Sequence, residues 1–69
     1  MNFLETVSAM GDSIMIPINR IRYISIRYIN GWEIHIVGDN EMDLSECFGE
    51  NEEKATKRYN RIRNIIEGG

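Results

Sequence analysis

The chain has few of the residues that fix a small protein covalently or supply it with reactive groups. Its 69 residues include one cysteine, one histidine, one tryptophan and one proline. A single cysteine excludes an internal disulfide, and one cysteine with one histidine falls short of the four ligands of a structural zinc site. The sequence therefore predicts no metal or other cofactor, and a protein suited to a reducing compartment.

Signals for targeting and membrane insertion are also missing. No run approaches the roughly 20 apolar residues of a transmembrane helix. The first residues, MNFLETVSAMGD, lack the basic start and the apolar stretch of a signal peptide. We expect a cytoplasmic protein with no membrane partner.

The chain is short and its charge is uneven. Its 69 residues suffice for one domain, 1–69, and a chain of this size buries only about 60% of its unfolded surface. Self-association, as in a homodimer, would extend so small a core. The net charge is −3, but residues 1–50 carry three arginines against eight acids (−5), whereas residues 51–69 carry five cations against three acids (+2). The acidic body argues against nucleic acid as the default partner.

The centre of the sequence, IRYISIRYIN at residues 21–30, contains the unit Ile-Arg-Tyr-Ile-x twice. The unit is five residues long and strand side chains alternate with a period of two, so the second copy is flipped relative to the first. The next segment, WEIHIV at residues 32–37, alternates cleanly between apolar and polar positions. A two-residue Asn-Gly turn would set apolar positions against polar ones. A three-residue loop with Gly31 in the left-handed conformation, as a G1 bulge, aligns the apolar ones.

We expect the register set by the three-residue loop. It pairs Tyr28 with Trp32, Ile26 with Ile34, and Ile24 with Ile36, and all six side chains point inward. The outward face then holds Tyr23, Ser25, Arg27 and His35, with Ile21 and Val37 near its ends.

The flanking segments complete an α+β fold. Strands are expected at about 2–9, 13–18, 21–28, 32–37 and 41–46, with 13–28 forming one bent strand or two, and a helix at about 51–67. A Gly11-Asp12 turn would set Ala9 opposite Ile14, Val7 opposite Ile16 and Glu5 opposite Ile18. We expect a four-stranded antiparallel sheet of two hairpins, with the C-terminal helix packed on one face.

Two local patterns support the last strand and the helix. Met42 and Leu44 alternate with acids and are expected to point inward. Asn51 is a suitable N-cap residue for the helix. One apolar stripe follows at helical spacing, formed by Ala55, Tyr59, Ile62 and Ile66.

Candidate chemistry is sparse. His35 and Cys47 are the nearest approach to a base and a nucleophile, but no nucleophile elbow or glycine-rich loop accompanies them. We therefore expect no enzyme and no small-molecule substrate, and we interpret Cys47 as a small buried hydrophobic residue. The acids from Asp39 to Glu46 alternate, but the position where an EF-hand loop requires glycine holds Leu44. A solvated acidic strand edge is the better interpretation.

Two surfaces remain as candidate binding sites. The leading one is the outward sheet face, because tyrosine and arginine are enriched at protein interfaces. Its partner-binding residues are expected to be Ile21, Tyr23, Arg27, His35 and Val37. The alternative is a nucleic-acid-binding helix face that would contact phosphates. Its residues are Lys54, Lys57, Arg58, Arg61 and Arg63.

The hydrophobic spacing of SIMIPINRIRYI, a glycine turn, EIHIVGDNEMDL and a terminal helix resembles small bacterial and phage accessory proteins. It is similar to the flagellar and swarming proteins of the FlbD/SwrD type, over about residues 3–66. The resemblance implies a non-enzymatic accessory protein and transfers no site residue. The sequence thus predicts a small protein–protein interaction or regulatory module, a class that includes inhibitors carried by phages or mobile elements.

Overall fold

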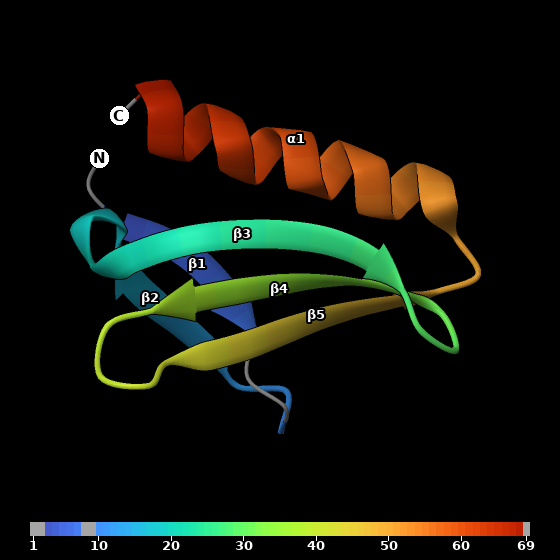
Figure 1. Ribbon diagram of the computed structural model, residues 1–69, viewed down its shortest axis with the longest axis horizontal. Coiled ribbons are helices and arrows are strands. Elements are labelled where there is room, and N and C mark those ends of the chain that lie inside the picture. The colour runs from blue at the N-terminus through green and yellow to red at the C-terminus, as the bar shows by residue number, and fades with distance from the viewer. Residues whose placement is uncertain (1–2, 8–9, 69) are drawn as a thin grey trace.

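The computed structural model describes residues 3–7 and 10–68 and has an α+β architecture. Five strands and a 3-10 turn precede one helix (Figure 1). The elements are β1 (Phe3–Val7), β2 (Ser13–Pro17), the 3-10 turn η1 (Ile18–Arg20), β3 (Ile21–Tyr28), β4 (Trp32–Gly38), β5 (Asp43–Gly49) and α1 (Glu52–Gly68).

The strands form two antiparallel sheets instead of the single four-stranded sheet expected from the sequence. One sheet is the β1–β2 hairpin, and the other has the order β3-β4-β5. The break falls where Pro17 ends β2 and η1 turns the chain into β3. Because proline lacks an N–H, it cannot continue a ladder through this point. Residues 13–28 are therefore two strands in different sheets.

The register of the β3–β4 hairpin is confirmed. Tyr28 pairs with Trp32, Ile26 with Ile34, and Ile24 with Ile36. The isoleucines belong to the core or pack against it, whereas Tyr28, which was expected to point inward, is 51% exposed. The rings of Tyr28 and Trp32 meet edge to face, with centroids 5.4 Å apart. Gly31 has the positive φ expected of it, at 137°, although the value typical of the left-handed helical region belongs to Asn30, at 56°.

The expected register of the first hairpin is wrong. Leu4 pairs with Ile16 and Thr6 with Ile14, so Leu4 and Thr6 point into the core. Glu5 and Val7, which the expected register set opposite Ile18 and Ile16, are exposed, and so is Phe3. Val7 pairs with Ser13 and not with Ile16, a shift of three residues along β2 from the pairing that a Gly11-Asp12 turn would give. The expected pairing of Ala9 lies outside the described residues.

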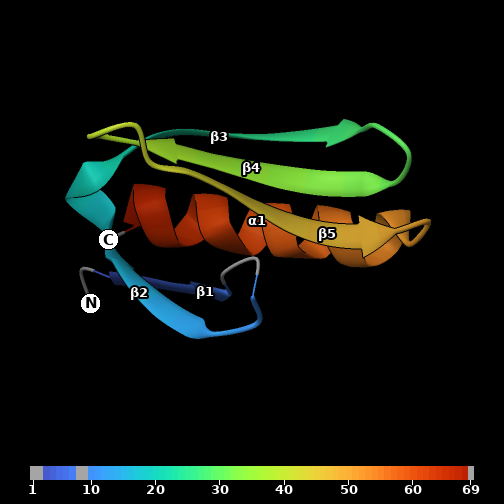
Figure 2. The ribbon, with the colours of Figure 1, turned by 90° about the horizontal axis from the view of Figure 1, so that it is seen from below.

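The core lies where the three-stranded sheet, the β1–β2 hairpin and α1 meet. Figure 2 shows the sheet and the hairpin on opposite sides, and Figure 1 shows α1 running along one side of the molecule, next to β3. The helix contacts all three strands of the larger sheet, as expected. The buried centre consists of Leu4, Ile34, Ile36 and Ile62. The partly buried residues Ile21, Ile24, Ile26, Met42, Leu44, Phe48, Tyr59, Ile65 and Ile66 pack around it.

The last strand and the helix differ from expectation only in their bounds. Asn40 and Glu41 both have positive φ and form the turn, so β5 begins at Asp43 and continues to Gly49. Met42 and Leu44 pack against the core as expected. The Asn51 side chain accepts a hydrogen bond from the Lys54 backbone N–H at 3.1 Å, which confirms the N-cap. In the part of the chain that the structure describes, no helix has the length and apolar character needed to cross a membrane.

Candidate functional site

The outer sheet face is the side of β3, β4 and β5 turned away from the core. The strand registers arrange its side chains in three cross-strand rows. These rows are Tyr23–Val37–Asp43, Ser25–His35–Ser45 and Arg27–Glu33–Cys47. No described helix or strand covers this face, since α1 and the hairpin both lie on the other side (Figure 2).

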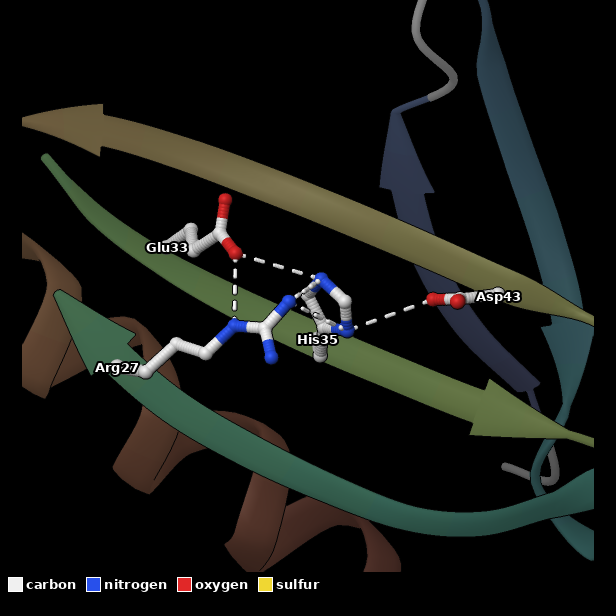
Figure 3. Close-up of polar contacts among 4 residues, drawn as sticks. All are labelled: Arg27, Glu33, His35 and Asp43. Atoms are coloured by element: carbon white, nitrogen blue, oxygen red, sulfur yellow. Dashed lines mark hydrogen bonds and ion pairs between the residues drawn. The ribbon is translucent and has the colours of Figure 1, made fainter. Parts of the chain in front are cut away.

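A charged network occupies the centre of the outer sheet face (Figure 3). Arg27 Nη2 lies 2.6 Å from His35 Nε2, and Arg27 Nε donates to Glu33 Oε1 at 2.8 Å. On the other side of the ring, His35 Nδ1 lies 3.4 Å from Asp43 Oδ1. Nε2 can accept a hydrogen bond from Arg27 in the tautomer that carries its proton on Nδ1, and Nδ1 then faces Asp43.

The central side chains of the network are less exposed than the outer ones. The side chains of His35 and Glu33 are 18% and 19% exposed, whereas Arg27 and Asp43 are more open. Since the charges already satisfy one another, a partner that covers this face does not need to supply all of their counter-charges. Tyr23, 59% exposed, stands beside Val37 at one end of the network and offers apolar surface.

Four of the five partner-binding residues expected from the sequence come together on the outer sheet face, and one does not. Tyr23, Arg27, His35 and Val37 share the face. Ile21 packs against the core instead. A register shift between Ile21 and Tyr23 reverses the alternation of side chains at that point, so the two residues lie on opposite sides.

Sequence reasoning missed Glu33, Asp43 and Cys47 as members of this face. Because side chains alternate along a strand, Glu33 and His35 lie on the same face of β4, so the sequence did contain the information that places Glu33 there. Asp43 reaches His35 only through the β4–β5 register, which the sequence does not specify. Cys47 is exposed, contrary to expectation. With Leu44 inward, the alternation of β5 sends Cys47 outward.

The five cations expected on the helix face do not form one common surface. Lys54, Lys57 and Arg61 are exposed and lie at spacing i, i+3, i+7, which makes one stripe along α1. Arg63 pairs with Glu67 at 3.2 Å. Arg58 turns toward the body of the protein, so the basic stripe is narrower than the sequence suggests.

Arg58 joins α1 to both sheets. Its Nε and Nη2 atoms donate to the two carboxylate oxygens of Glu46, each at 2.8 Å. Nη2 also donates to the Glu5 carbonyl oxygen at 2.8 Å. The hydrogen bonds to Glu46 raise the pKa of Arg58, although burial opposes the shift. The guanidinium is therefore a fixed structural charge.

Glu46 completes this contact from the β5 side. The buried Thr6 hydroxyl donates a hydrogen bond to Glu46 Oε2. Burial raises the pKa of the Glu46 carboxyl, but the hydrogen bonds from Arg58 and Thr6 and the charge of Arg58 outweigh it and lower the pKa overall. Glu46 is thus ionised at neutral pH in the folded protein.

We also looked for a metal-binding site among the described residues. They hold no group of three His, Cys, Asp or Glu side chains placed to share a metal ion. Comparison of the chain with protein-family models, curated proteins and solved structures finds no match. The resemblance to the FlbD/SwrD type therefore stays a prediction.

Proposed function

We propose that the protein is a small non-catalytic interaction or regulatory module that contacts a protein partner through the outer sheet face. One observation carries the proposal. Exposed Tyr23 and its neighbour Val37 adjoin an organised charge network on a sheet face that no described element covers. Tyrosine and arginine anchors surrounded by fixed polar groups are typical of the centres of protein interfaces.

The geometry of His35 supports a binding role over a catalytic one. Its ring nitrogens face Arg27, Glu33 and Asp43, so the ring holds the network together. Cys47 lies in another cross-strand row, opposite Glu33. A nucleophile needs a base directed at it, and His35 is engaged elsewhere. The proposed role is that of a cytoplasmic accessory protein, and an inhibitor from a phage or mobile element is one form of it.

The partner is either a second copy of the chain or a different protein. A two-fold dimer through this face would be self-complementary, with each Tyr23 packing against the opposing copy. Each large apolar side chain removed from water contributes about 1.5–3 kcal/mol before the costs of association. Four such side chains, Tyr23 and Val37 from each copy, would contribute at most about 6–12 kcal/mol, which is comparable to the cost of association of about 4–15 kcal/mol, so self-association through them alone would be weak.

Sedimentation velocity over a hundredfold range of concentration tests the self-association. The wild-type chain of 8.0 kDa is expected to shift toward a dimer as concentration rises. The double variant Tyr23→Lys/Val37→Lys is expected to stay monomeric with an unchanged circular dichroism spectrum. Lys57→Glu, on the exposed side of α1, is the control and should behave like the wild type. A wild-type chain that remains near 8.0 kDa throughout would exclude the homodimer.

A second candidate function rests on the basic stripe of α1. Lys54, Lys57 and Arg61 are exposed and aligned, so they can contact successive phosphates. Three phosphate contacts predict that the logarithm of the affinity for duplex DNA falls with the logarithm of salt concentration with a slope of about −2.7. Fluorescence anisotropy with labelled duplex and single-stranded probes measures this slope. Lys57→Glu/Arg61→Glu should abolish binding, and absence of binding at low salt would remove this function.

A further inference from the structure

A groove separates β5 from the β1–β2 hairpin. Its volume is about 590 Å³, within the range of sites that hold ligands. Figure 2 shows the two sheets apart on this side, with α1 behind the gap. The lining residues are Glu5, Thr6, Val7 and Ser13 from the hairpin, Ser45, Glu46, Cys47 and Phe48 from β5, and Arg58 from α1.

The strand β5 meets this groove with its edge. Four consecutive residues, Ser45–Phe48, line the groove, although their side chains alternate between the two faces of the sheet. Only the edge of a strand presents residues of both kinds to one cavity. On the opposite wall, Glu5, Thr6 and Val7 are consecutive as well, so β1 also borders the groove with an edge.

The free edge of β5 has unpaired hydrogen-bonding capacity. β5 is the last strand of its sheet and pairs only with β4. Alternate residues of an edge strand direct their N–H and C=O groups away from the partner strand. Among the described residues, no backbone hydrogen bond joins β5 to β1 across the groove. Side chains bridge the gap instead, through Thr6 with Glu46 and through Arg58 with the Glu5 carbonyl.

We propose that this groove receives an extended segment of a partner protein, which adds to the edge of β5 as a further strand. Main-chain hydrogen bonds to a sheet edge supply affinity in this mode, and side-chain pockets supply specificity. Ser45–Phe48 span about 13 Å, which four extended residues cover. The proposal rests on the proposed function only in that the ligand is a protein, and it uses a different surface from the Tyr23 end of the outer sheet face.

The charges of the groove specify the segment. Glu5 and Glu46 face one cation, Arg58, which Glu46 already engages. The exposed Glu5 carboxylate therefore favours a lysine or arginine, while exposed Val7 and partly buried Phe48 favour apolar side chains. A second copy of β5 is a poor occupant, because its sequence DLSECFG has two acids and no cation and would bring like charges together. The segment is thus extended, apolar at alternate positions, and basic.

A displayed library of random eight-residue peptides, selected on the full 69-residue chain, supplies the probe. Enriched peptides are expected to be net positive with alternating apolar residues. Synthetic copies of the best sequences should shift the backbone amide resonances of Glu5–Val7 and Ser45–Phe48, and should slow alkylation of the single exposed cysteine, Cys47. Slowed hydrogen exchange at alternate β5 amides would show strand addition directly.

Matched charge reversals separate this site from the others. Glu5→Lys should weaken binding about three- to tenfold, since a favourable charge contact becomes an unfavourable one. Glu53→Lys makes the same charge change in the first turn of α1 and should leave binding unchanged, as should Tyr23→Lys/Val37→Lys. The proposal is overturned if no peptide is enriched over an unrelated protein. It is also overturned if bound peptides are insensitive to Glu5→Lys, or if their amide shifts map to the Tyr23 end of the outer sheet face or to α1.

Discussion

Arg58→Ala should destabilise the protein by about 1.5–3 kcal/mol, the range for hydrogen bonds to charged groups. The change leaves the Glu46 carboxylate, 11% exposed, with Thr6 as its remaining side-chain donor. This loss of stability should exceed about 0–1 kcal/mol, which is the typical contribution of a solvent-exposed ion pair. It should stay below about 3–5 kcal/mol for a fully buried pair, because the Arg58 side chain is 25% exposed.

Urea unfolding followed by circular dichroism and by the fluorescence of Trp32 measures this cost. Urea is preferred to guanidinium because it does not screen charges. For a domain of this size, a loss of 2 kcal/mol lowers the midpoint of thermal unfolding by about 8–16 °C. Arg61→Ala, which removes the same side chain from the exposed stripe one turn away, is the control and should cost under about 0.5 kcal/mol.

A double-mutant cycle identifies the interaction responsible. Glu46→Ala, Arg58→Ala and the double variant should show a coupling of about 1–3 kcal/mol between the two side chains. A coupling near zero, or an Arg58→Ala cost no larger than that of Arg61→Ala, would refute the reasoning. In that case Glu46 and Arg58 would be a solvated pair without structural consequence.

Two further predictions concern the loss of stability in acid and the steric effect of a side chain at Gly38. The pKa of Glu46 is lower in the folded protein than in the unfolded chain, so its contribution is present above the unfolded value of about 4.3 and is lost as pH falls through the lowered folded value. Glu46→Gln should therefore lose less stability than the wild type between pH 5 and pH 2 in urea titrations. Gly38→Ala should cost about 1–3 kcal/mol, because a Cβ there would overlap the Arg20 carbonyl oxygen and the Met42 side chain. Alanine at exposed Gly68, where a Cβ meets open space, is the control.

The parts of the fold that could be predicted are those where one register clearly buries more apolar surface than another. In the β3–β4 hairpin, a slip of one residue would bring Ile34 opposite Arg27, so the pattern leaves one good solution. The first hairpin has no such contrast. Phe3 and Val7 flank Glu5 on one face of β1, while Leu4 accompanies Thr6 on the other, and only the tertiary environment decides between them.

The separation into two sheets depends on where η1 directs the chain, which is a property of the whole fold. The Pro17 signal marks a break without giving its angle. For the outer sheet face, alternation sufficed to place Tyr23, Arg27 and His35. Asp43 required the register of a neighbouring strand, and Arg58 required its contact with Glu46 from another element. Sequence patterns therefore predict which side chains share a face of one strand or helix, but they do not predict which residues of different elements come into contact.

Photo-crosslinking in the cell that makes the protein tests the proposed interaction most directly. The photoreactive amino acid p-benzoylphenylalanine replaces Tyr23 in one variant and Lys57 in another, so that each reports contact at one surface. A protein partner on the outer sheet face predicts a single light-dependent adduct from the Tyr23 position, whether to a second copy or to another protein, and none from the Lys57 position. Adducts from the Lys57 position alone, or no adduct from the Tyr23 position, would contradict the account.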